Sequence, residues 1–244
     1  RQRQMCIRDR LILIPNVNIA SEVPAVKFLG IFIDPLLNFK YHIGKLSKKL
    51  ATSLYFMRSA KNFLTLNARK SMYYSLFHSV LIYGIHLWSS AAQTNLNGLI
   101  IKQKMAVRII HGANYNDHTE PLFKNLKILP FEHLSNFFGL QFMQQYVQNF
   151  LPSSFVDTWT LNNERRAEDF HINLRNNDVF DVPFARLVSL ERLPLTRFPK
   201  LWSEFNAGNI KILRNKPMFN KELKEFLLNQ LNDVIICDRL FCPQ

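Results

Sequence analysis

Residues 26–34 read Val26-Lys27-Phe28-Leu29-Gly30-Ile31-Phe32-Ile33-Asp34, and this stretch decides the fold class of the chain. It is rich in β-branched and aromatic residues and lies between Pro24 and Pro35, which is typical of a strand or one arm of a β-hairpin. Gly30 marks either a bulge or a point where another group approaches the backbone closely. No other stretch carries a good strand signal, so we expect a mainly α protein with one short β-hairpin.

The rest of the chain has the apolar spacing of α-helices. Apolar residues recur at intervals of three and four from Ile43 to Met57 and predict a helix over 41–62. Thr65 is a suitable cap for a second helix that reaches about residue 88, and Gly112 would end a third that starts near residue 95. The same reasoning predicts helices over 120–129, 131–149 and 220–234, and a loop-rich connector with short elements over 153–217.

The charge is concentrated in one part of the chain. Lys and Arg number 31 against 18 Asp and Glu, a net charge of +13. Residues 1–150 hold 18 basic and 6 acidic side chains, whereas residues 151–244 hold 13 and 12. The excess of positive charge in residues 1–150 indicates a polyanionic partner, either nucleic acid or an anionic membrane surface. No apolar run approaches the 18 residues of a membrane span.

The first ten residues are set aside from the fold argument. They begin with Arg1 rather than Met and resemble translated adapter sequence, so we expect a fragment with a non-native segment over 1–10. Without Cys6, the remaining thiols are Cys237 and Cys242. Two thiols with no nearby His do not make a zinc site, and we expect none.

A basic, acid-free segment is the strongest functional signal. Residues 35–70 carry eight Lys and Arg and no acid, with aromatic residues interleaved (Tyr41, His42, Tyr55, Phe56 and Phe63). Lysine and arginine neutralise phosphates, while aromatic rings stack on bases or sugars. The alternative is a solvated helix face above core aromatics. The surfaces of soluble proteins mix both signs of charge, so a basic segment without a single acidic residue favours nucleic-acid contact over this alternative. The candidate contacts are Lys45, Lys48, Lys49, Arg58, Lys61, Lys102, Lys104 and Arg108.

The chain lacks the residues of a self-sufficient polymerase or nuclease. Two-metal chemistry needs clustered carboxylates, and Asp34 stands alone after the strand. There is no glycine-rich phosphate loop and no hydrolase or metalloprotease motif. We therefore assign no catalytic residue and no metal ligand.

An ordered set of short motifs extends over roughly residues 11–235. Residues 26–34 are followed by 37–43, and then by the segments 64–68, 73–79, 83–88, 103–110, 118–123, 126–130, 199–202 and 219–224. Each motif is weak alone. In this order and spacing they resemble the end of the polymerase region in reverse transcriptases of jockey-like, LINE-type non-LTR retrotransposons.

That resemblance implies a domain organisation and a set of roles. Residues 11–40 would be the end of the palm, 41–130 a thumb-like helical domain and 131–244 a helical, loop-rich C-terminal extension. Phe28, Leu29 and Gly30 would lie on the primer-grip side, and Lys45, Lys48, Lys49 and Lys61 would face the template–primer duplex. The implied partners are the RNA template, the RNA–DNA duplex and an upstream palm and fingers domain, in the nucleus and cytoplasm and without a membrane.

The resemblance also implies what this segment does not do. In that family of transposable elements the catalytic aspartates, which bind Mg²⁺, precede the glycine-containing strand. They are not among these residues. The segment is therefore expected to belong to an RNA-directed DNA polymerase, to grip the duplex, and to be inactive alone without a cofactor of its own. Without the palm, Phe28, Ile31 and Ile33 are expected to form an exposed apolar patch.

Two other interpretations stay open. The chain would be a stand-alone helical module that binds nucleic acid or a protein, or a relic of a decayed element without function. The first predicts a monomer that folds without a palm, and the second predicts frameshifts in sibling copies.

Overall fold

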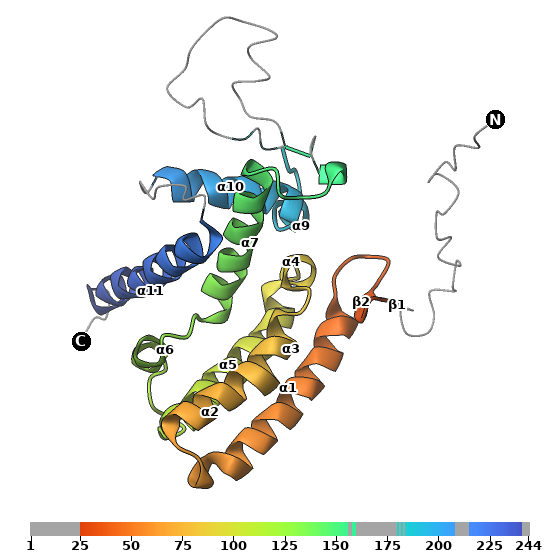
Figure 1. Ribbon diagram of the computed structural model, residues 1–244. Helices are drawn as coiled ribbons and strands as arrows, with labels where there is room; N and C mark the ends of the chain where they lie inside the picture. Colours follow the sequence, from red (N-terminus) through yellow and green to blue (C-terminus); the bar gives the residue numbers. More distant parts are fainter. Residues whose placement is uncertain are drawn as a thin grey trace, which may run out of the picture.

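The computed structural model describes residues 25–155, 158–159, 180, 182, 184–207 and 215–240, with backbone only for 206–207 and 232–240. The adapter-like segment, the first part of the expected palm end and the side chains of Cys237 and Cys242 lie outside the described residues. Within them the fold is mainly α, with one short antiparallel hairpin, as predicted (Figure 1).

The described elements follow one another along the chain in this order. They are β1 (Val26–Phe28), β2 (Ile31–Ile33), α1 (Lys40–Ala60), η2 (Lys61–Phe63), α2 (Leu66–Met72), the π-helical η3 (Tyr73–His78), α3 (Ser79–Ile82), α4 (Ile85–Trp88), α5 (Gln93–His111), α6 (Glu120–Leu126), α7 (Phe131–Val147), η4 (Ser153–Phe155), α9 (Val188–Glu191), α10 (Pro194–Ala207) and α11 (Lys216–Leu240).

The stretch 26–34 is a complete hairpin rather than one strand. Val26 pairs with Ile33 and Phe28 pairs with Ile31, so only Leu29 and Gly30 form the turn. Their φ angles are 45° and 85°, and two consecutive residues with positive φ are typical of the tight turn that suits twisted strands. Gly30 is therefore a turn residue and not a bulge. The ring of Tyr83 lies beside this turn, but a Cβ on Gly30 would be 3.5 Å from it, which is ordinary van der Waals contact, so the positive φ rather than a close approach favours glycine here.

Helix α1 begins after a loop that its own side chains close. Asp34 accepts a hydrogen bond from the backbone N–H of Asn38 through Oδ1 (2.9 Å), and Asn38 Oδ1 accepts one from the N–H of Lys40 (2.9 Å). The predicted apolar stripe is the buried face of α1 and packs against α5, α3 and η3. The opposite face of this 21-residue helix lies in solvent.

The second predicted helix, 65–88, is wrong as one continuous element. Thr65 does cap its start, and Oγ1 accepts from the N–H of Ala68 at 3.4 Å. The helix then widens into the π-turn η3 and ends at Tyr83. Gly84 has a φ of +64°, a left-handed conformation that interrupts the helix before α4. The apolar periodicity continues across this break, which is why the sequence pattern missed it.

The loop-rich expectation for 153–217 is also wrong in part. Helix α10 occupies 14 residues of this segment, starts at Pro194 and includes Pro199. Phe198, Trp202 and Phe205 are buried on one of its faces against α7 and α11. Burying three large aromatic side chains stabilises a helix more than one interior proline destabilises it. The last helix, α11, is longer than the predicted 220–234.

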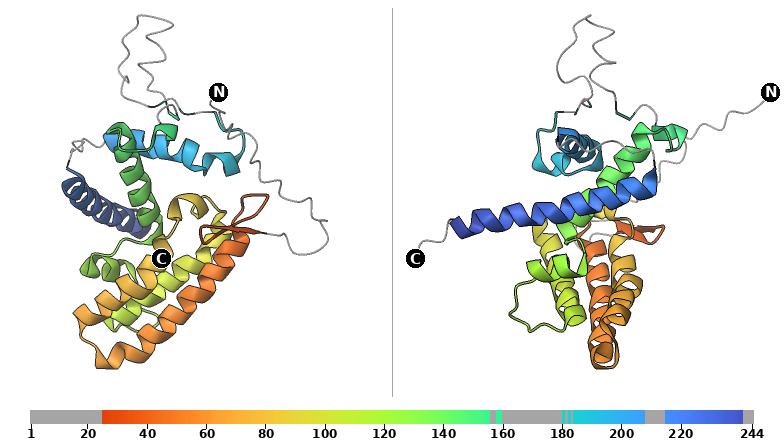
Figure 2. Two further views of the ribbon diagram at one scale, coloured as in Figure 1. Left: turned by 45° about the vertical axis from the view of Figure 1, so that its right-hand side comes forward. Right: turned by 60° about the vertical axis from the view of Figure 1, so that its left-hand side comes forward.

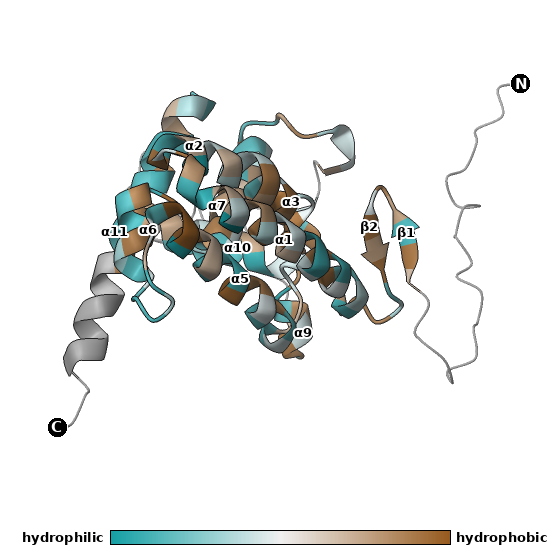
Figure 3. Ribbon diagram, turned by 90° about the horizontal axis from the view of Figure 1, so that it is seen from below, coloured by the Kyte–Doolittle hydropathy of each residue, from teal (hydrophilic) through white to brown (hydrophobic). Residues whose placement is uncertain are grey.

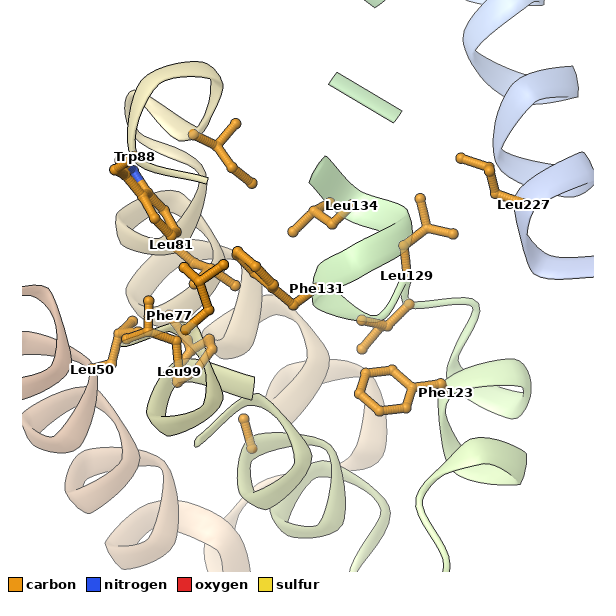
Figure 4. Packing of buried hydrophobic residues seen from close by; sticks show 14 of the residues in the cluster. Leu50, Phe77, Leu81, Trp88, Leu99, Phe123, Leu129, Phe131, Leu134 and Leu227 are labelled. Carbon is orange, nitrogen blue, oxygen red and sulfur yellow. The ribbon is translucent and has the colours of Figure 1, made fainter. Parts of the chain in front are cut away.

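One hydrophobic core joins these helices. Phe131 at the start of α7 stacks on Trp88, with ring centroids 5.6 Å apart, and links α4 to the C-terminal half (Figure 4). Helix α11 crosses α7 (Figure 2). Its side chains Leu223 and Leu227 belong to the same core. The hairpin lies at one side of the helices, and α6 and α11 lie at the opposite side (Figures 1 and 3).

Candidate nucleic-acid interface

Lysines and aromatic rings share the solvent face of α1. With 3.6 residues per turn, Tyr41, Lys45, Lys48 and Tyr55 fall within one narrow stripe opposite the buried face, and Lys49 flanks it. All five are exposed, and Tyr55 is 67% exposed. We name the exposed stripe made by Tyr41, Gly44, Lys45, Lys48, Lys49, Thr52, Tyr55 and Phe56 the α1 face.

A groove lies at the N-terminal end of the α1 face. It has a volume of about 550 Å³, and its lining comes from the loop after β2 and from the first turns of α1. The lining residues are Asp34, Asn38, Lys40, Tyr41, Gly44, Lys45 and Lys48. The ammonium of Lys45 lies 5.3 Å from the ring centroid of Tyr41, a cation–π contact that holds the lysine beside the groove.

Gly44 leaves the groove open on the helix side. No atom lies within 4 Å of the position that a Cβ on Gly44 would take, and its φ is ordinary for a helix. Glycine inside a helix lowers stability by about 0.5–1 kcal/mol relative to alanine. No packing in the described structure requires glycine here. The missing side chain lets a ligand approach the backbone of α1 between Lys40, Lys45 and Lys48.

The structure separates the two interpretations of the interleaved aromatics. Tyr41, Tyr55, Phe56 and Phe63 are exposed, and the rings of Tyr55 and Phe56 meet edge to face at 5.8 Å. They are therefore available to stack on bases or sugars. His42 is the exception. It is buried beside Trp88, and burial, with a smaller effect from Lys49, lowers its pKa.

The other candidate cations do not join the α1 face. Lys102 and Lys104 lie about 160° apart around α5, so no single surface presents both. Lys61 approaches Gly112 at the C-terminal end of α5, where its charge complements the helix dipole. Arg108 donates from Nε and Nη2 to the carbonyl oxygen of Asp117, at 3.0 and 2.9 Å, and so holds the loop after α5. Arg58 is exposed on the flank of α1.

The hairpin tip is fixed to the break between α3 and α4. The hydroxyl of Tyr83 donates a hydrogen bond to the carbonyl oxygen of Leu29. Phe28 and Leu29 are exposed, with Leu29 75% exposed. Ile31, by contrast, is buried beside Gly84, and Ile33 is half-buried. The expected exposed patch is therefore wrong for Ile31, because its side chain packs at Gly84, in the break between α3 and α4.

A second basic cluster was not predicted. Lys124 and Lys127 at the end of α6 and Lys221 and Lys224 on α11 line a space of about 550 Å³, together with Glu225, Leu228 and Asn229. We name this space the lysine cleft. Lys221 and Lys224 are three residues apart on one face of α11, whereas Lys127 is the residue that ends α6, so the spacing along the chain signals only the first pair. The sequence did not show the cluster for two reasons. The two pairs of lysines are nearly 100 residues apart, and acidic residues alternate with the lysines of α11, as they do on a solvated helix face.

The charges of the lysine cleft affect the pKa values of Lys224 and of neighbouring His78. The pKa of Lys224 is lowered by burial and then by the charges of Lys70 and Lys127. Burial lowers the pKa of His78 to about 4, and the charge of Lys224 contributes. Positive potential from the cleft thus reaches the π-helical segment.

The described residues offer no catalytic metal centre. No group of three or more His, Cys, Asp and Glu among them could hold a metal ion. A Mg²⁺ ion that the resemblance implies does not fit Asp34, since Oδ1 is used by the backbone of Asn38 and no second carboxylate joins it in this part of the chain. No described helix is long and apolar enough to span a membrane.

Comparison with known proteins gives homologues of one kind. The chain is 31% identical over 107 residues to "RNA-directed DNA polymerase from mobile element jockey" of Drosophila melanogaster, which covers 43% of this chain and 12% of that protein. The jockey polymerase of Drosophila funebris is 30% identical over 125 residues, 50% of this chain and 14% of that protein. "Probable RNA-directed DNA polymerase from transposon BS" of Drosophila melanogaster is 26% identical over 113 residues.

These matches confirm the resemblance to jockey-like non-LTR retrotransposon polymerases. The matched region spans only about an eighth of the curated relatives' length. No protein-family model matches the chain, and no solved structure matches it significantly.

Proposed function

We propose that this chain is the part of a non-LTR retrotransposon reverse transcriptase that holds the RNA template and the growing DNA. The observation that carries the proposal is the α1 face, on which three exposed lysines alternate with exposed aromatic rings beside a groove open to the helix backbone. The homology to RNA-directed DNA polymerases supports nucleic acid as the class of ligand.

The α1 face would bind the duplex mainly through its sugar–phosphate backbone. Lys45, Lys48 and Lys49 would neutralise phosphates and release counterions, which is independent of sequence. Tyr41 and Tyr55 would contact sugars or unpaired bases at their exposed faces. At Gly44 a phosphate or sugar would reach the helix backbone. Phe28, Leu29 and Gly30 at the hairpin tip would lie toward the primer.

Phosphoryl transfer is not assigned to this part of the enzyme. It requires carboxylates that hold divalent ions, and the described residues contain no such cluster. Under this proposal the ions and their ligands belong to the rest of the polymerase. The chain alone would position the duplex without extending a primer.

The test is the salt dependence of binding to an RNA–DNA hybrid, followed by fluorescence anisotropy. With three to five phosphate contacts, log K should fall against log salt with a slope of about −3 to −4.5. The double variant Lys45→Gln/Lys48→Gln should make the slope shallower by about 2. The matched control is Lys200→Gln/Lys216→Gln, which removes the same charge from residues distant from the α1 face. A salt-independent affinity, or equal loss in both variants, would contradict the proposal.

A second candidate is a stand-alone nucleic-acid-binding module. It is favoured by the burial of Ile31 against the break at Gly84, which covers part of the hairpin without another domain. Size-exclusion chromatography with light scattering discriminates the two. A stable monomer favours the module, and association that ends on addition of the upstream polymerase domains favours the segment of a larger enzyme.

A further inference from the structure

The lysine cleft gathers positive charge that the protein itself does not neutralise. Four lysines line it against one carboxylate, that of Glu225, and Lys70 of α2 is close enough to affect Lys224. In the described part of the chain none of these lysines forms an ion pair within 4 Å, whereas Lys200 and Glu191 do so at 3.2 Å. Like charges brought together in a concave site repel one another, and a bound anion would remove that repulsion.

The backbone at Lys127 adds an independent observation. Lys127 ends α6 with a φ of +53°, in the left-handed region, and its N–H bonds back to Phe123 and Lys124. Glycine or asparagine is favoured at this position of a helix end because other side chains are strained there. A lysine at this position costs stability, yet its side chain lies in the cleft beside Lys124.

The lining also limits the kind of anion. Lysine is a point charge with rotatable donors and suits phosphate oxygens without fixing their geometry. Asn229 adds a polar amide, and Leu228 is the one apolar side chain of the lining. No aromatic ring is among the lining residues, in contrast to the α1 face. The cleft is therefore suited to a sugar–phosphate backbone rather than to bases.

We propose that the lysine cleft between α6 and α11 is a second phosphate-binding site, which takes the backbone of a nucleic-acid strand on the side of the molecule opposite the hairpin (Figures 1 and 3). The nature of the strand rests on the proposed function, but the residues do not overlap with the α1 face. A strand that reaches from the hairpin side past α11 would occupy both sites. A short strand would occupy one of them.

The test uses the double variant Lys127→Asn/Lys221→Gln in the 244-residue chain. Asparagine suits the left-handed backbone at position 127, so this variant should fold with unchanged circular dichroism and a similar melting temperature. For a long RNA–DNA hybrid the salt slope should become shallower by about 1.5–2, with roughly tenfold weaker binding at moderate salt. Lys200→Gln/Lys216→Gln is again the matched charge control, and Glu225→Gln should strengthen binding.

A footprint of lysine reactivity supplies a readout that does not depend on affinity. Lys224 and Lys221 are acylated with an amine-reactive ester, with and without the hybrid, and the modified peptides are quantified by mass spectrometry. Bound hybrid should protect both lysines and leave Lys200 unchanged. Inorganic tripolyphosphate serves as the second probe, and it should protect the same two lysines at higher concentration.

The outcomes separate this site from the α1 face. If Lys127→Asn/Lys221→Gln matches its control while Lys45→Gln/Lys48→Gln weakens binding, the lysine cleft is overturned and the proposed function stands. If only the cleft variant weakens binding, the cleft is supported and the α1 face is contradicted. A wild-type chain that binds tripolyphosphate but no nucleic acid would overturn both proposals.

Discussion

The Cδ1 atom of Ile31 occupies the space that a Cβ atom on Gly84 would need. Gly84 has a φ of +64°, so the backbone conformation favours glycine there, and any larger residue would also have to displace the end of the Ile31 side chain. This contact fixes the hairpin to the break between α3 and α4. Trp88 stabilises the same break, because its Nε1 donates a hydrogen bond to the carbonyl oxygen of Tyr83 at 2.9 Å.

Gly84→Ala should destabilise the fold by about 1–3 kcal/mol, measured by urea unfolding. About 1 kcal/mol comes from the left-handed backbone and the rest from overlap with Ile31. In the double variant Gly84→Ala/Ile31→Ala the overlap disappears, so the two substitutions should show a favourable coupling. Additive losses would mean that the hairpin does not pack on this corner.

Gly44→Ala and Gly98→Ala form a matched pair. Both glycines lie inside helices and exposed, with nothing within 4 Å of an added Cβ, so each substitution should stabilise the protein by about 0.5–1 kcal/mol. Binding should differ. Gly44→Phe fills the groove and should weaken binding of the RNA–DNA hybrid at least tenfold, whereas Gly98→Phe should leave the affinity unchanged. Equal affinities would remove the groove from the proposed interface.

Stability should fall as the pH is lowered from 6.5 toward 4. The pKa of His78 in the folded protein is about 4, below its ordinary 6.5, so the unfolded chain binds the proton first. The stability contributed by neutral His78, at most about 3 kcal/mol, is present above pH 6.5 and lost by about pH 4. His78→Gln should flatten this part of the profile from chemical denaturation.

Lys224→Gln is the companion variant for the pH profile. It removes the charge that contributes to the lowered pKa of His78, so the pKa of His78 in the folded protein should rise toward 6.5. The loss of stability on acidification should then be smaller than in the wild type and should end at a higher pH. Buried His42 and half-buried His86 and His133 also have lowered pKa values and give a residual slope in every variant. An identical profile for wild type and His78→Gln would contradict the burial of this histidine.

Gln103 should be the costliest polar side chain to replace in the core. Its Nε2 donates to the carbonyl oxygen of Leu129 at 2.9 Å and to the hydroxyl of Tyr73 at 3.2 Å, which ties α5 to η3 and to the segment before α7. Gln103→Leu leaves both acceptors buried without a donor and should cost about 2–4 kcal/mol. Tyr73→Phe removes one acceptor with its ring retained and should cost less than about 1.5 kcal/mol. A reversed order in thermal unfolding would contradict this network.

Local chemistry made several elements predictable from the sequence. The stripe from Ile43 to Met57 is the buried face of α1, Thr65 caps α2, and Gly112 ends α5 with a φ of +87°. These features depend on the spacing of neighbours along one helix and on the conformational freedom of single residues. The acid-free run of lysines on α1 belongs to the same class, because all its members lie on one helix.

Tertiary packing decided what no local pattern contains. Gly84 interrupts a helix whose apolar spacing continues across the break, and Ile31, 53 residues earlier, packs against it. In α10, the burial of three aromatic side chains against α7 and α11 stabilises the helix by more than Pro199 destabilises it. Arg108 lies in a basic sequence but binds its own loop. The lysine cleft exists only where α6 meets α11. The sequence by itself determined which faces are apolar or charged, and the fold determined which of those faces meet, because contact free energies arise between residues far apart in the chain.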